Sequence, residues 1–342
     1  MPACAQGPDG LGEGLAATPN GTEAARRWQG TKELDPTEEV CDMLVPVVAG
    51  IDGSAESLAA AEWAAREAVR RECPLRLVHA WNWSPRSADG ATDNAAQRHL
   101  ARRVLHQAEG RVQGAHPGVR LYEEQVEGPA TAALLNAAEQ AELLVLGSRG
   151  LTGLSGFLVG SVALGVVAKA TRPVVLVRAG EDQEDEHLPA DDGSTSMRTG
   201  YRDVVLGIDL GDPCDEVIEF AFEAARLRHA RLRVIHAWQP SSPVSLGPGD
   251  IGLVRPPQRE GEWEGFLKAV LQIWRDKHPE VDVVESVSEG KASTAVIRAA
   301  SGASLLVVGR RTTERPVGRR IGPVAHAAIH HVSCPVAVVP HD

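Results

Sequence analysis

The chain has 342 residues, 43% of them hydrophobic, and carries a formal net charge of −11 at pH 7. This length and apolar content allow two modest hydrophobic cores, while no apolar stretch is long enough to cross a bilayer, so we expect no membrane partner. The acidic balance argues against general binding of nucleic acid or phospholipid.

Residues 1–44 are predicted to form a disordered extension, because they are rich in Gly, Ala, Glu and Pro and show no sustained apolar period. The extension does not begin with a basic and apolar export signal. The five cysteines of the chain include no Cys-x-x-Cys pair, which favours reduced thiols. Together these features lead us to expect a cytoplasmic protein.

Residues 45–179 alternate apolar runs with helix-like stretches, a pattern typical of a parallel sheet covered by helices on both faces. The first helix is predicted to begin after Ser54, which serves as its N-cap, and to continue through an alanine-rich body to Arg71. The expected strands are Pro46–Ile51, Leu75–Ala80, Arg120–Val126, Leu143–Leu146 and Val174–Val177.

A glycine-rich stretch follows the fourth expected strand and precedes a helix-like segment. It reads Gly147-Ser148-Arg149-Gly150, then nine other residues, then Gly160-Ser161. Strand, glycine loop and helix start in this order bring several backbone N–H groups onto one anion. Side chains at 147, 150 and 160 would block a close approach, and Ser161 is expected to cap the helix and to add a hydroxyl donor. We interpret the stretch as a phosphate cradle rather than as a flexible loop.

Residues 180–200 form an acidic linker, which we expect to be a solvated tether. After the linker the first pattern returns. Val204–Asp209 repeats Val47–Asp52, and Val234–Trp238 repeats Leu77–Trp81 at the same offset. Gly309 later repeats Gly147 at an offset that is larger by five residues. One constant offset on each side of a single small insertion indicates a duplication.

The glycine pattern and its surroundings resemble the universal stress protein family. The resemblance rests on Gly147-x-x-Gly150-x9-Gly160-Ser161 with Pro173–Val177, on Gly50–Ser54 and on Leu77–Ala80. It implies an α/β fold with two tandem domains at 45–179 and 201–342, each a five-stranded parallel sheet with helices on both faces. It also implies an intramolecular pseudo-dimer, in which the last strands Val174–Val177 and Val336–Val339 pair.

In the ATP-binding branch of this family the glycine loop holds the phosphates, and the aspartate after the first strand lies near the ribose and phosphates. Main chain at the end of the second strand meets the adenine. The resemblance therefore implies an ATP site in the first domain, with Asp52 also near a Mg²⁺ ion. The implied residues are Gly50, Ile51, Asp52, Ala80, Gly147, Ser148, Arg149, Gly150, Gly160, Ser161 and Val162.

The second copy lacks two parts of the cradle. Thr312 stands in the place of Gly150, and Pro323 replaces Ser161, which removes a hydroxyl and a backbone N–H. Two lost hydrogen bonds to charged oxygens, at about 1.5–3 kcal/mol each, would weaken binding by a few orders of magnitude. We expect this copy to bind ATP poorly or not at all.

Other polar groups receive a structural interpretation. The second copy's loop carries the arginines Arg310, Arg311, Arg315, Arg319 and Arg320, which we expect to be solvated and to meet acidic neighbours. His79 and His236 end the second strands and are expected to form structural hydrogen bonds. His326 and His330 are four residues apart on a predicted helix, but no third metal ligand accompanies them. The helix of the second copy is predicted to begin with Asp212 as its N-cap and Pro213 as its first residue.

The leading hypothesis is an ATP-binding sensor or regulator of the stress response, in which the second copy is a pseudo-symmetric partner. A slow ATPase is the enzymatic alternative, since Asp52 could bind magnesium and Arg149 could reach a phosphate, but no catalytic base is evident. A scaffold that binds no nucleotide is the third. The sequence does not identify protein partners, and it leaves open whether two chains form a homodimer.

Overall fold

The computed structural model of the chain describes residues 44–81, 90–148, 159–180, 182–239, 260–312 and 321–342, with side chains from residue 95 onward in the second range. Leu44–Asp342 form one compact unit. The N-terminal extension was predicted to be disordered, and its residues 1–43 lie outside the described part. Within the described part, none of the helices combines the length and the apolar character that a membrane span requires.

The first copy contains five strands and four described helices in alternation. The strands are β1 (Val47–Gly50), β2 (Leu75–Trp81), β3 (Leu121–Glu127), β4 (Leu143–Ser148) and β5 (Val174–Arg178). The helices are α2 (Ala55–Arg70), α3 (Gly90–Ala115), α4 (Ala130–Glu139) and α5 (Ser161–Val167). Each strand begins and ends within two residues of its prediction.

The second copy repeats this alternation. Its strands are β6 (Val204–Ile208), β7 (Leu232–Trp238), β8 (Val283–Glu289), β9 (Leu305–Arg311) and β10 (Val336–His341). Its described helices are α6 (Asp215–Arg228), α7 (Glu260–Lys277), α8 (Ala292–Ala299) and α9 (Pro323–His331).

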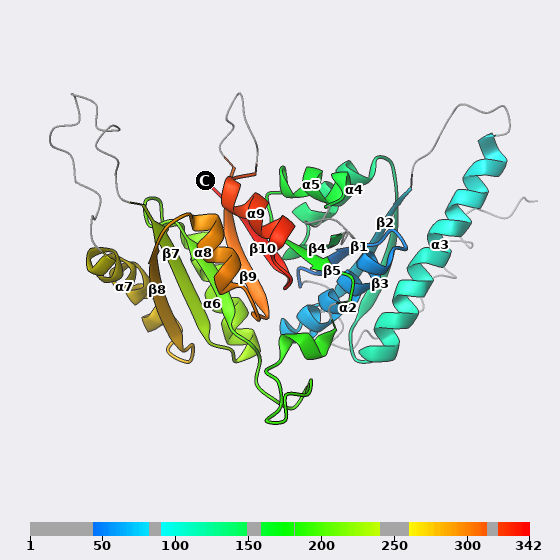
Figure 1. The fold of residues 1–342 in the computed structure, drawn as a ribbon. Helices are drawn as coiled ribbons and strands as arrows, with labels where there is room; N and C mark the ends of the chain where they lie inside the picture. The colour runs from blue at the N-terminus through cyan, green and yellow to red at the C-terminus, as the bar shows by residue number, and fades with distance from the viewer. Residues whose placement is uncertain (1–43, 82–89, 149–158, 181, 240–259, 313–320) are drawn as a thin grey trace, which may run out of the picture. The chain divides into compact units, whose positions relative to one another are not determined.

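All ten strands of the described residues join in one sheet, in the order β3-β2-β1-β4-β5-β10-β9-β6-β7-β8, which runs from right to left in Figure 1. Neighbouring strands within each copy are parallel. The junction between the copies is antiparallel, with Val336 opposite Leu176 and Val338 opposite Val174. The predicted pairing of the two copies through their last strands is therefore confirmed.

Two apolar layers cover the two faces of the sheet. Val47 and Ala49 of β1 belong to the layer that contains α2, whereas Val48 belongs to the layer that contains α4, because successive strand residues point to opposite faces. Each layer continues from the first copy into the second. Burial on both faces explains why the strand sequences are continuous apolar runs rather than alternating ones.

The helix that follows β1 begins as predicted, whereas its counterpart begins later. Ser54 is the N-cap of α2, and its hydroxyl accepts a hydrogen bond from the Ser57 N–H at 3.2 Å. In the second copy the prediction of an Asp212 cap is wrong, because α6 begins at Asp215 with Cys214 as its N-cap. The carboxylate of Asp212 instead pairs with Arg311 at 2.6 Å.

The acidic linker is not a solvated tether throughout, so that prediction is wrong for its first part. Gln183–Glu186 form a 3-10 helix, and Glu186 is only 3% exposed. Its carboxylate accepts hydrogen bonds from Arg66 at 2.8 Å and from Arg70 at 2.5 Å, both on α2. These two cations compensate the cost of burying the carboxylate and fix the linker to the first domain.

Candidate functional site

The expected site residues of β1, β2 and β4 lie at one edge of the sheet. Gly50 is opposite Val78 of β2 on one side and opposite Leu146 of β4 on the other. Asp52 follows Gly50 by two residues and so leaves the sheet at the edge where β2 and β4 also end, near Ala80 and Ser148. The chain order reverses at the boundary between β1 and β4, and ligands of open α/β sheets bind outside the carboxyl ends of the strands at such a point.

Asp52 is exposed and is held by a local turn. Its Oδ1 accepts hydrogen bonds from the backbone N–H of Ser54 at 2.9 Å and from the Ser54 hydroxyl at 2.5 Å. Gly53, between them, has a φ of +85°, which glycine adopts without strain. The turn thus fixes a carboxylate at the carboxyl end of β1, and carboxylate oxygen is a ligand that suits Mg²⁺.

The start of α5 supplies backbone donors, but the predicted cap is displaced by one residue. Gly160 is the N-cap, with φ −60° and ψ 149°, and Ser161 is the first helical residue. Ser161 as N-cap is therefore wrong, because Gly160 already has the extended conformation that a cap adopts. Ser161 and Val162 are exposed, and N–H groups in a first helical turn lack an intrahelical acceptor.

The glycines of the predicted cradle have different roles. A Cβ on Gly147 would lie 2.5 Å from the backbone carbon of Glu56, so this glycine lets the first turn of α2 pack on β4. Its explanation as a gap for phosphate is therefore wrong. A Cβ on Gly160 would meet no described atom within 4 Å, which leaves the original explanation standing there. Gly150 and its neighbour Arg149 lie outside the described residues.

Two further polar residues at this edge are used by the fold. The Ser148 hydroxyl is buried and donates to the carbonyl of Val177 at 3.2 Å, so only the main chain of Ser148 is left to contact a ligand. His79 Nδ1 lies 2.7 Å from the carbonyl of Ile51 and ties β2 to the exit of β1. In the second copy His236 Nδ1 lies 3.2 Å from the carbonyl of Ile208. The structural interpretation of both histidines is confirmed.

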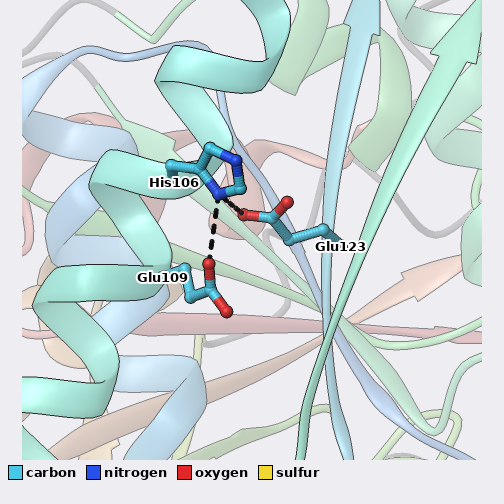
Figure 2. Close-up of side chains that lie close together, drawn as sticks. All are labelled: His106, Glu109 and Glu123. Carbon is cyan, nitrogen blue, oxygen red and sulfur yellow. Dashed lines mark hydrogen bonds and ion pairs between the residues drawn. The ribbon is translucent and has the colours of Figure 1, made fainter.

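A cluster that sequence reasoning missed lies between α3 and the outer strand β3. Figure 2 shows His106 of α3 between two carboxylates, with its Nδ1 3.2 Å from Glu109 Oε2 and 3.2 Å from Glu123 Oε1. Among described residues, these three could together offer ligand atoms to a metal. The His106 side chain is 64% exposed, and its contacts with the two carboxylates already explain the arrangement, so we assign no metal. The spacing of His106 and Glu109 could have indicated the helical pair, but not Glu123.

The equivalent edge of the second domain is filled by its own residues. Gly207 is opposite Val308, so Asp209 leaves β6 beside β9 as Asp52 leaves β1 beside β4. A Cβ on Gly309 would lie 2.9 Å from the ring of His341, near the C-terminus. Thr312 also contacts this end, because its N–H donates to the His341 carbonyl at 2.6 Å and its hydroxyl donates to the carboxylate of Asp342.

The two described arginines of the second copy's loop differ in their partners. Arg311 pairs with Asp212, as expected of a solvated arginine with an acidic neighbour. Arg310 contradicts that expectation, because it is only 6% exposed. It donates hydrogen bonds to the carbonyls of Ala168, at 3.3 Å, and Ala170 in the first domain. Burial lowers the pKa of Arg310. Residues 313–320, with the remaining arginines, lie outside the described part.

Comparisons with known proteins agree with this architecture. The model of the Universal stress protein family matches residues 43–178 and 200–340. The chain is 34% identical over 306 residues to a universal stress protein of Mycolicibacterium smegmatis, covering 86% of this chain and 96% of that protein. It is 30% identical over 303 residues to one of Mycobacterium tuberculosis, covering 85% and 96%.

Solved structures show the same fold. The crystal structure of a universal stress protein from Archaeoglobus fulgidus superposes with a TM-score of 0.65 at 16% identity, over 87% of this chain and 98% of that one. At this identity the likeness concerns the fold alone. The two family matches and the relatives of similar length carry the assignment: the chain belongs to the universal stress protein family and contains two tandem copies of its domain.

Proposed function

We propose that the first domain binds ATP, with Mg²⁺, at the edge formed by β1, β2, β4 and the start of α5. The observation that carries the proposal is the Gly147–Ser161 spacing combined with the register of β1 against β4, which places Asp52 beside the strand that leads into the glycine loop. Family membership supports it, since the glycine signature is the one found in the ATP-binding branch.

The arrangement suits a triphosphate in three parts. The backbone N–H groups of Gly160, Ser161 and Val162, with the Ser161 hydroxyl, would donate to the phosphates. Asp52 would hold Mg²⁺ or the ribose. Main chain at Ala80 would contact the adenine. Every group in this set except Ala80 would contact phosphate, metal or sugar. The binding energy would therefore come mainly from the charged phosphates of ATP rather than from its base.

We propose further that the second domain does not bind ATP. Pro323 begins α9 at the position of Ser161 and has neither an N–H nor a hydroxyl to donate. Thr312 adds a side chain where Gly150 has none, and His341 lies over Gly309. Asp209 alone would not replace these donors.

The protein would act as an ATP-responsive regulator of the stress response rather than as an enzyme. Fast hydrolysis requires a group that orients water against the γ-phosphate. The carboxylate of Asp52 at this edge already accepts two hydrogen bonds from Ser54. ATP recovered intact after incubation would support a regulator, whereas turnover that Asp52→Asn abolishes would favour the slow ATPase.

Calorimetric titration of the nucleotide-stripped full chain with MgATP tests the proposal. The variant Gly150→Thr/Ser161→Pro gives the first domain the residues of the second. It should weaken ATP binding about 100-fold or more, because two donors to charged oxygens are lost. The matched control is Pro323→Ser, which alters the equivalent position of the second domain and should leave the affinity unchanged.

Two results would refute the site. Unchanged ATP affinity in the folded Gly150→Thr/Ser161→Pro variant would place the nucleotide elsewhere. A wild-type chain that neither retains nucleotide through purification nor binds added MgATP would favour the scaffold alternative.

A further inference from the structure

The second domain holds one end of the helix that begins at the proposed phosphate site. Arg310 of β9 reaches across the junction, and its guanidinium donates to the carbonyls of Ala168, at 3.3 Å, and Ala170. Ala168 is the C-cap of α5. A cation at the C-terminus of a helix interacts favourably with the carbonyls that have no intrahelical donor. Arg310 therefore acts as a cap that one domain supplies to a helix of the other.

The hydrogen bonds of Arg310 are costly to lose because its side chain is buried. The described hydrogen bonds of its guanidinium all go to carbonyl oxygens, those of Ala168, Ala170 and Arg311. A buried charge that loses such partners costs considerably more than an exposed one. Movement of the C-terminal end of α5 would therefore break hydrogen bonds that Arg310 cannot replace with water.

The two ends of α5 are close enough to move together. The helix has seven residues, Ser161–Val167, which corresponds to about 10 Å at 1.5 Å per residue. Its N-terminal end carries the backbone donors of Ser161 and Val162, and its C-terminal end meets Arg310. Fixing one end of so short a helix restricts the direction and position of the other.

A contact in the other direction, from the first domain to a helix of the second, provides an internal comparison. Arg178 of β5, in the first domain, donates to the carbonyl of Ile329 near the C-terminal end of α9, at 3.2 Å. It is buried like Arg310, with 6% exposure for each. The helix that it holds begins with Pro323 and lacks the phosphate donors. Both arginines thus join the domains, but only Arg310 holds a helix that begins at the proposed nucleotide site.

We propose that Arg310 is a positioning residue for the nucleotide site of the first domain, and that the second domain serves that site by holding α5. The inference rests on the proposed ATP binding. Arg310 occupies the position in the second copy that Ser148 has in the first. The second domain, which lacks the cradle, thus uses this position to support the nucleotide site of the first domain. Because coupling is reciprocal, ATP bound at the start of α5 would in turn stabilise the Arg310 contact.

MgATP titration of the nucleotide-stripped full chain compares Arg310→Ala with Arg178→Ala. Arg310→Ala should weaken ATP binding about 10-fold or more, whereas Arg178→Ala should stay within about twofold of wild type. Arg310→Lys should give an intermediate affinity, because a point charge cannot donate to both carbonyls in the geometry of a guanidinium. Thermal unfolding of each variant checks that the chain is folded.

Equal losses of affinity in Arg310→Ala and Arg178→Ala would overturn the proposal, since they would mean that any weakening of the junction has this effect. Unchanged affinity in folded Arg310→Ala would overturn it as well. If the wild-type chain binds no ATP, the proposed function fails and the role of Arg310 at a nucleotide site fails with it. If the wild type binds and only the Arg310 comparison fails, the proposed function stands.

Hydrogen exchange in the nucleotide-free protein supplies a readout that does not depend on binding. Arg310→Ala should speed amide exchange at Leu164, whose N–H donates to the Gly160 carbonyl at the start of α5 at 3.0 Å, several-fold more than Arg178→Ala does. Equal exchange in both variants would show that Arg310 does not hold this helix end and would refute the positioning role directly.

Discussion

In both domains equivalent strands form the edge at which their carboxyl ends lie, and in the first domain this is the edge of the proposed nucleotide site. The residues at this edge differ between the domains. In the first domain, Gly147 lets α2 pack closely on β4, and its counterpart Gly309 is also a glycine, where a Cβ would meet the ring of His341. By contrast Ser161 has become Pro323, and Gly150 has become Thr312. The duplication has kept the glycine at 147 and 309, and it has changed two residues, Gly150 and Ser161, that would face a ligand.

The junction between the domains is also asymmetric. Arg71 at the end of α2 and its counterpart Arg228 at the end of α6 both donate to one carboxylate, that of Glu67, at 2.8 and 2.7 Å. The residue equivalent to Glu67 in the second copy is Ala224. One buried acid of the first domain therefore neutralises the same arginine of both copies.

The largest loss of stability is expected from Glu67→Ala. It would leave Arg228, which is 1% exposed, without its closest carboxylate, and breaking a buried pair in this way costs about 3–5 kcal/mol. The control is Glu219→Ala, which breaks the exposed pair with Lys277 and should cost about 1 kcal/mol or less. Denaturant unfolding measures both, and similar losses would contradict the role given to Glu67.

A smaller loss is expected from Gly147→Ala. Its new Cβ would lie 2.5 Å from the backbone of Glu56, and overpacking of this kind costs about 1–3 kcal/mol. Gly309→Ala should cost less, because the atom 2.9 Å away belongs to the side chain of His341, which can turn aside. Equal unfolding midpoints for the two variants would show that the two glycines have the same role.

The buried linker carboxylate predicts a dependence of stability on pH. Arg66 and Arg70 more than offset the effect of burial and hold the pKa of Glu186 below its ordinary value of 4.5. Because this pKa is lower in the folded state, Glu186 stabilises the fold above about pH 4.5, and the contribution is lost as the pH falls through the folded pKa.

Glu186→Gln should therefore make the acid loss of stability shallower, by about 1.4 kcal/mol for each unit by which the pKa is lowered. The exposed Asp191→Asn is the control and should leave the pH profile unchanged. Denaturant unfolding between pH 3 and 7 measures both, and identical profiles for wild type and Glu186→Gln would contradict the burial of the linker.

The smallest effect is expected from restoring the second site. The variant combines Thr312→Gly and Pro323→Ser in a chain shortened to end at Pro340. The shortening removes the contacts of His341 and Asp342, and Pro323→Ser restores an N–H and a hydroxyl donor. A second ATP should then bind at least about 10-fold more weakly than the first, since the other residues of the loop still differ. Calorimetric stoichiometry detects it. Failure to gain any binding would mean that these side chains are not what closes the second edge.

Much of the fold was predictable because the sequence repeats itself. Apolar runs located all five strands of the first copy, and the family resemblance predicted the junction of Val174–Val177 with Val336–Val339. Ser54 was recognised as a cap because caps depend on neighbouring residues. The order of the strands was not predictable from this pattern alone.

The errors concern contacts between residues far apart in sequence. Glu186 looked solvated in an acidic run, but it is buried because Arg66 and Arg70 of α2 meet it. Arg310 looked like one more loop arginine, but the neighbouring domain places two carbonyls of α5 within its reach. Local patterns cannot reveal such partners, since the placement of whole domains creates them.

Native mass spectrometry of the nucleotide-stripped full chain with MgATP tests the central claim most directly, because it counts bound ATP per chain. We expect one ATP on the wild-type chain and none on the Gly150→Thr/Ser161→Pro variant. Two ATP molecules per wild-type chain would contradict the loss of the second site, and none would contradict ATP binding by the first domain.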